Sequence, residues 1–129
     1  MRDQLKDRCN KIEECYEFTL AYAAQGVSGD AGSQSGGQVR VLLQRAAEGL
    51  TGLPEAITAS GLPAHPFVAV VDRDARDSLA AIQLVLAQPA LSSQLIDNLN
   101  ASIHLRALLT DLFLIDEILK LQRVTSVAG

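Results

Sequence analysis

The chain has 129 residues, which is enough for one domain with a sizeable hydrophobic core. Its 11 basic and 15 acidic residues give a net charge of −4, and the basic residues are scattered among the acids. Nucleic-acid-binding proteins normally carry a basic stripe, and anionic membrane surfaces attract one, so we expect neither kind of partner. Hydrophobic residues make up 48% of the chain and aromatic residues only 4%, a composition that suits helices packed through Leu, Ala, Ile and Val.

The sequence carries no signal for export or for a metal centre. Its first residues, MRDQLKDRCNKIEE, lack the apolar core of a signal peptide. No apolar run approaches the roughly 18 residues that span a bilayer, so we expect a cytoplasmic protein. Cys9 and Cys15 lie on one predicted helix but point about 120° apart, so we expect two reduced thiols. Two cysteines and two widely separated histidines give no zinc spacing, and we expect no metal and no cofactor.

The first predicted helix covers residues 2–25. Its core stripe repeats at steps of three and four residues and consists of Leu5, Cys9, Ile12, Tyr16 and Leu20. Phe18 and Tyr22 lie outside that stripe and form a pair on its flank, four residues apart. The pair either covers a neighbouring helix or forms an exposed aromatic patch, and it is therefore our candidate for a partner interface.

Residues 26–37, GVSGDAGSQSGG, predict a flexible linker within the single domain. The second predicted helix begins near Gln38, and Pro54 interrupts its pattern. Proline removes a backbone donor and clashes with the carbonyl group four residues earlier, so this helix is kinked or broken near Pro54. We favour the kink.

The second half of the chain predicts two long antiparallel helices. Residues 60–66 contain two prolines and form a turn, and the third predicted helix covers residues 67–88. A short connection containing Pro89 follows, and Ser92 is a suitable N-cap for the fourth helix, residues 92–122. Residues 123–129 lack helical signals, and we expect a frayed tail.

The fourth predicted helix carries two apolar strips instead of the single stripe of a surface helix. One strip consists of Ile96, Leu99, Ile103, Leu114 and Leu121, and the other of Leu105, Leu108, Leu112, Ile115 and Leu119. Two strips indicate neighbours on both sides. This helix is therefore central to a bundle or shared across a homodimer interface.

A polar seam lies on the short arc between these strips and includes Asn100, His104 and Asp111. If both strips are buried, these side chains point inward, and each unpaired polar group costs about 1–3 kcal/mol. Two interpretations remain open. The seam either fixes helix register or oligomeric state, as core polar residues do in coiled coils, or it forms a ligand or proton-transfer site in the bundle core.

The stretch Ile103–His104–Leu105–Arg106–Ala107 resembles the phospho-accepting segment of histidine phosphotransfer domains, which are four-helix bundles. The resemblance covers these five residues and would make His104 the accepting residue. The family's motif carries a glycine where this chain has Ala107, and the accepting histidine faces solvent, whereas the helical pattern turns His104 inward.

Together these patterns predict an all-α, four-helix bundle with a long, central C-terminal helix. No pattern assigns catalytic residues. The predicted function is a non-enzymatic interaction, adaptor or assembly module, with a protein partner or a second copy of the chain bound through helix faces. The alternatives are a small-molecule sensor or enzyme using Asn100, His104 and Asp111, and more remotely a phosphotransfer module.

Overall fold

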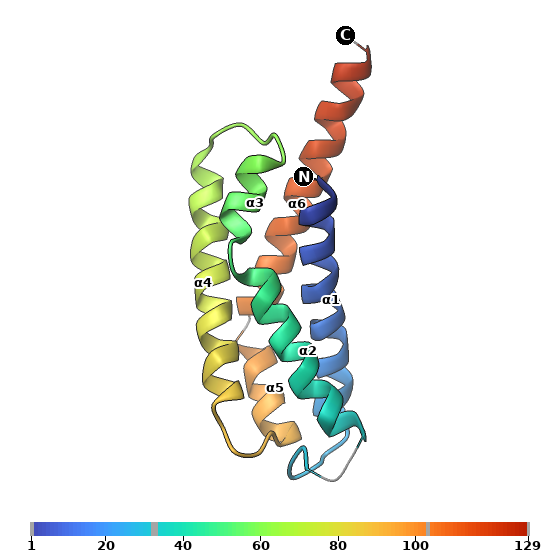
Figure 1. Ribbon diagram of the computed structural model, residues 1–129, viewed down its shortest axis with the longest axis vertical. Helices are drawn as coiled ribbons and strands as arrows, with labels where there is room; N and C mark the ends of the chain where they lie inside the picture. The colour runs from blue at the N-terminus through green and yellow to red at the C-terminus, as the bar shows by residue number, and fades with distance from the viewer. Residues whose placement is uncertain (1, 32–33, 103, 129) are drawn as a thin grey trace.

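The computed structural model describes residues 2–31, 34–102 and 104–128, without the side chains of residues 2–3, 34–35, 104 and 123–128. Within these residues the chain is all-α, as predicted, and contains six helices (Figure 1). They are α1 (Arg2–Ala24), α2 (Gln34–Leu50), α3 (Leu53–Ala59), α4 (Pro66–Leu86), α5 (Ser93–Ala101) and α6 (His104–Ala128). The prediction of four helices is corrected to six because two of the predicted helices are broken.

The first break separates α2 from α3. Gly52 adopts a left-handed conformation with a φ of 79°, which ends α2 and lets the chain restart with Pro54 in the first turn of α3. Proline suits that position because the first helical N–H groups have no partner within the helix. The second predicted helix is therefore broken near Pro54, and the kink that we favoured from the sequence is wrong.

The second break separates α5 from α6 at Ser102, so residues 92–122 are not one helix. The Ser102 hydroxyl donates to the Leu99 carbonyl at 2.6 Å, and its backbone N–H bonds to the carbonyl groups of Asn98 and Leu99. A serine hydroxyl that bonds a carbonyl group of the preceding turn offers the backbone an alternative to continuing the helix. The predicted N-cap is confirmed, because the Ser92 hydroxyl accepts a hydrogen bond from the Leu95 N–H at 3.0 Å.

The core face of α1 differs from the predicted stripe. It consists of Leu5, Ile12, Cys15, Thr19 and Tyr22, whereas Leu20 is 47% exposed. The predicted and observed stripes share Leu5 and Ile12. After Ile12 the buried positions follow at steps of three, four and three residues, whereas the prediction took two steps of four to Tyr16 and Leu20 and so rotated off this face.

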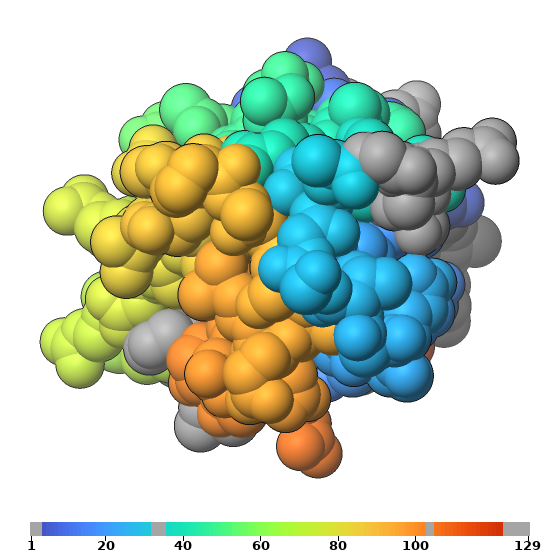
Figure 2. All heavy atoms as spheres, turned by 90° about the horizontal axis from the view of Figure 1, so that it is seen from below, coloured from blue at the N-terminus to red at the C-terminus, as the bar shows by residue number. Residues whose placement is uncertain are grey.

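The loop after α1 is anchored to the rest of the bundle. Val27 and Ser93 bond twice, from the Ser93 N–H to the Val27 carbonyl and from the Val27 N–H to the Ser93 hydroxyl, both at 2.9 Å. Seen from the end of the bundle, this loop lies beside the α4–α5 connection (Figure 2). Parts of the predicted linker therefore pack against residues more than 60 positions later in the chain.

The helices pack around one core that draws on α1 to α6. Helix α4 packs against α6 on one side and α2 on another, and α1 packs against α2 and α5. The helical backbone of α6 continues to Ala128, beyond the predicted end at Gln122, and its last turns project past the N-terminal end of α1 (Figure 1).

Candidate functional site

The residues of the predicted polar seam reach different neighbours. Asn100 lies on α5 and contacts Thr19 of α1, with 3.1 Å between Thr19 Oγ1 and Asn100 Oδ1. Asp111 lies on α6 beside Asp74 of α4. The side chain of His104 lies outside the described residues. Asn100 and Asp111 are therefore not brought together in a single site.

The contact between Thr19 and Asn100 is a buried polar link between α1 and α5. The Thr19 hydroxyl also lies 2.9 Å from the Tyr16 carbonyl, and Asn100 Nδ2 is buried with no hydrogen-bond partner among the described residues. A hydroxyl has one proton to donate. Turning the Asn100 amide by 180° lets Nδ2 donate to Thr19 Oγ1 while Thr19 donates to Tyr16. This arrangement resembles a structural cross-link.

The two carboxyl groups of Asp74 and Asp111 form a cluster that the sequence analysis missed. Burial, a hydrogen bond with Asp74 and repulsion from its charge raise the pKa of Asp111 to about 7. When both groups are ionised there is no donor between them, and Asp111 Oδ2 is buried without a partner among the described residues. A proton on Asp111 supplies the missing donor. The helical pattern marked Asp111 as an inward-facing acid, whereas Asp74 lies in a run of mixed acidic and basic residues, 72–77, which is typical of a solvated face.

Ser78 adds a buried hydroxyl one turn after Asp74 on α4. Its side chain is 1% exposed, and its Oγ has no hydrogen-bond partner among the described residues. Residues four apart on a helix lie on the same face, so Ser78 and Asp74 both belong to the side of α4 that meets the core and α6.

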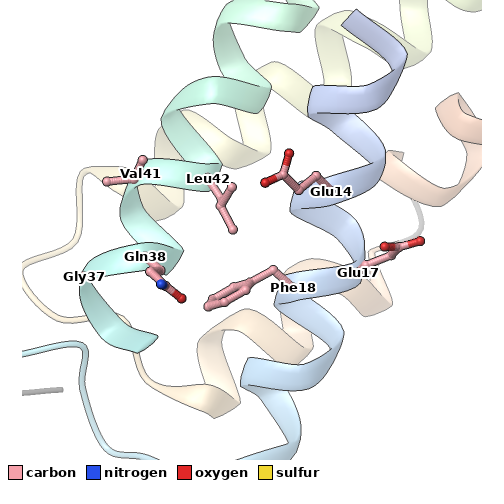
Figure 3. Close-up of a pocket in the computed structure, with 7 residues that line it drawn as sticks. All are labelled: Glu14, Glu17, Phe18, Gly37, Gln38, Val41 and Leu42. Carbon is pink, nitrogen blue, oxygen red and sulfur yellow. The ribbon is translucent and has the colours of Figure 1, made fainter. Parts of the chain in front are cut away.

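A groove with a volume of about 660 Å³ lies between α1 and α2. Figure 3 shows Phe18 of α1 and Leu42 of α2 directed across it, with Gln38 beside them and Glu17 on the far side of α1. Val41 is exposed at its edge, and a methyl group added at Gly37 would meet no atom within 4 Å. Phe18 thus lines a surface that an apolar side chain could enter.

Tyr22, the other predicted interface residue, is fully buried. Its hydroxyl donates to the Leu91 carbonyl at 2.6 Å. The aromatic pair is therefore divided, with Tyr22 in the core and Phe18 at the groove.

The outer side of α6 carries large exposed apolar residues. Leu114 and Leu121 are 49% and 66% exposed, and they lie seven residues apart in the same row as the partly buried Ile118. The second predicted strip is buried as expected, whereas the first divides: Ile96 and Leu99 of α5 are buried, but Leu114 and Leu121 face outward. Ile103 lies outside the described residues. The expectation that the whole helix is enclosed on two sides is therefore wrong for this single chain.

A second hollow, of about 460 Å³, lies between α1 and α6 and is lined by Cys9 and Phe113 together with charged residues. Burial, with the charges of Asp116 and Glu13, raises the pKa of the Cys9 thiol to about 11. Burial raises the pKa of Cys15 to about 12. Both groups are therefore protonated thiols near neutral pH, which argues against a nucleophilic cysteine.

In the described part of the chain, no group of three or more His, Cys, Asp or Glu side chains is placed to hold a metal ion. Across the same residues, no helix combines the length and the apolar character needed to cross a membrane. No protein-family model, no curated protein and no solved structure matches this chain.

Proposed function

We propose that the protein is a non-enzymatic helical interaction module that self-associates through the outer face of α6. The observation that carries this proposal is the row formed on that helix by the exposed Leu114 and Leu121 with the partly buried Ile118 between them. The row follows the three- and four-residue spacing of helices that pack against another helix. Ala107 lies on the same row, which gives the face a length of about 20 Å.

The position of the row supports the same function. The buried side of α6 already packs into the core through Leu105, Leu108, Leu112, Ile115 and Leu119, and the outer leucines lie outside that core. Isolated exposed leucines are common in soluble proteins, but an aligned set on a helix that projects from a bundle is typical of a contact surface (Figure 1). Two copies that use the same row form a closed, symmetric dimer.

The experiment compares the wild-type chain with Leu114→Ser/Leu121→Ser by sedimentation velocity over about a hundredfold range of concentration. We expect the wild type to dimerise and the double variant to remain monomeric, with equal helical content by circular dichroism. Leu84→Ser is the matched control, because Leu84 is 67% exposed on a different helix, α4. This variant is expected to dimerise like the wild type.

A third variant separates the α6 face from the groove between α1 and α2. Gly37 lines the groove, and a Cβ atom added there would meet nothing within 4 Å, so Gly37→Leu adds an apolar side chain at this surface. If self-association uses α6, this variant dimerises normally. Loss of the dimer in Gly37→Leu, with retention in the double leucine variant, would assign the contact to the groove of Phe18. A wild-type chain that stays monomeric at every concentration contradicts self-association.

A further inference from the structure

The interface between α4 and α6 contains an arrangement that the proposed function does not use. Asp74 and Asp111 approach each other from the two facing helices, and Asp111 Oδ2 is enclosed without a donor. The Ser78 hydroxyl, one turn from Asp74, is also enclosed without a partner. Buried acceptors that lack a donor are expensive, and two like charges at a packed helix interface add repulsion.

We propose that Asp74 and Asp111 form a proton-operated latch, in which one shared proton joins α4 to α6 and its loss leaves two carboxylates repelling each other across the interface. In the closed form, one carboxyl O–H donates to the neighbouring carboxylate. In the open form, the pair must separate, admit water or attract a cation. This inference is independent of self-association through α6.

The direction of the pH dependence follows from the raised pKa. An aspartic acid in an unfolded chain has a pKa near its ordinary value of 3.8, whereas the folded state holds the Asp111 proton up to about pH 7. Between these values the folded state binds one proton more than the unfolded state. The contribution of this pair to stability is therefore greatest at low pH and falls as pH rises toward 7. The folding equilibrium constant is expected to fall several-fold per pH unit, with about tenfold as the ceiling for one proton.

The helices that carry the pair, and the helices packed against them, hold other ionisable groups, whose effects on stability must be distinguished from that of the pair. On the same two helices these are Arg73 and Arg106, Asp77, which already takes part in an interaction, and His104, whose side chain is not described. The other helices packed against α4 and α6 also carry ionisable side chains, among them Glu13, Arg45, Glu48, Glu55 and Asp97. The neighbouring charge that raises the pKa of Asp111 is that of Asp74.

The first experiment observes the carboxyl groups directly. Aspartate side-chain ¹³C resonances of the full chain are assigned and titrated by NMR from about pH 4 to about pH 8. One carboxyl resonance is expected to titrate near pH 7 in the wild type and to disappear in Asp111→Asn. A wild-type chain in which the Asp74 and Asp111 resonances both titrate at ordinary aspartate values overturns the latch.

The second experiment measures urea unfolding of the same chains across this pH range. The wild type is expected to lose stability as pH rises, whereas Asp111→Asn and Asp74→Asn should both show a flatter dependence. His104→Gln removes an ionisable side chain of α6, and Asp97→Asn removes an exposed acid of α5, so both variants should retain the wild-type slope. If His104→Gln abolishes the slope while Asp111→Asn preserves it, the histidine is responsible and the latch is wrong.

Discussion

Asp30, in the loop after α1, and Arg40, in α2, form an ion pair that joins three segments of the chain. The Asp30 carboxylate also accepts the Leu91 N–H at 2.7 Å, and Arg40 donates to the Gln88 carbonyl at 2.9 Å. The α1–α2 loop is thereby tied to the α4–α5 connection. These bonds to Arg40 and Leu91 lower the pKa of Asp30 below its ordinary value.

We therefore expect Asp30→Ala to destabilise the protein by about 2–3 kcal/mol, since it removes two charge-assisted hydrogen bonds and leaves Arg40 without its partner. The measurement is urea unfolding near neutral pH. Arg45→Ala is the control, because its ion pair with Glu14 is 3.7 Å long and exposed on both sides, and such pairs contribute about 0–1 kcal/mol. An equal loss in both variants contradicts the anchoring role of Asp30.

The ion pair between Asp30 and Arg40 also predicts that the protein loses stability at low pH. Because the folded-state pKa of Asp30 is lowered, its contribution is present above the ordinary value of 3.8 and is lost as pH falls below it. The raised pKa of Asp111 has the opposite effect on the free energy of unfolding, which it lowers as pH rises toward 7. Unfolding measurements in acid should show a loss of stability in the wild type that is weaker in Asp30→Asn.

Two buried serines allow a test of hydrogen-bond satisfaction. Ser93 donates to the Tyr22 carbonyl at 2.7 Å and accepts from the Val27 N–H, whereas Ser78 Oγ has no partner among the described residues. Ser93→Ala should cost about 1–3 kcal/mol, because the Val27 N–H loses its side-chain partner and the Tyr22 carbonyl keeps only the Gln25 N–H. Ser78→Ala removes an unsatisfied group and should leave the free energy of unfolding unchanged or raise it. A comparable loss in both variants would mean that Ser78 has a partner.

Two adjacent glycines at the start of α2 should respond oppositely to alanine. A methyl group at Gly36 would lie 2.0 Å from the Asp30 carbonyl oxygen, while one at Gly37 would meet nothing within 4 Å. Gly36→Ala must displace the Asp30 loop and should destabilise by more than about 1 kcal/mol, whereas Gly37→Ala should be neutral or stabilise by about 0.5 kcal/mol. Thermal unfolding of the two variants distinguishes them, and equal melting temperatures would contradict the close approach of Asp30.

The two cysteines should be slow to react in the folded chain. Cys15 is fully buried, and the raised pKa values leave little thiolate at either position near pH 8. Alkylation by iodoacetamide is expected to be slow at Cys9, slower at Cys15 and fast at both residues in urea. Mass spectrometry of peptides over time measures the order, and rapid labelling of folded Cys15 would contradict its burial.

Local sequence signals predicted the local features well. The all-α class, the extent of α1 and the N-cap at Ser92 all depend on residues within a few turns of each other. Pro54 marked an interruption, but Gly52, which takes the left-handed conformation that few other residues tolerate, converts it into a break. Helix propensity and capping act through neighbouring residues, so they can be read from the chain.

The sequence could not predict which side chains meet. A helical wheel places Asn100 and Asp111 on one arc only while the helix is continuous, and the interruption at Ser102 resets the phase between them. Asn100 then reaches Thr19, and Asp111 reaches Asp74, because the crossing of α1 and α4 against these helices selects the contacts. Periodicity gives a side chain's direction about its own helix axis. Tertiary packing decides what lies in that direction, and here it placed a second carboxyl group beside Asp111.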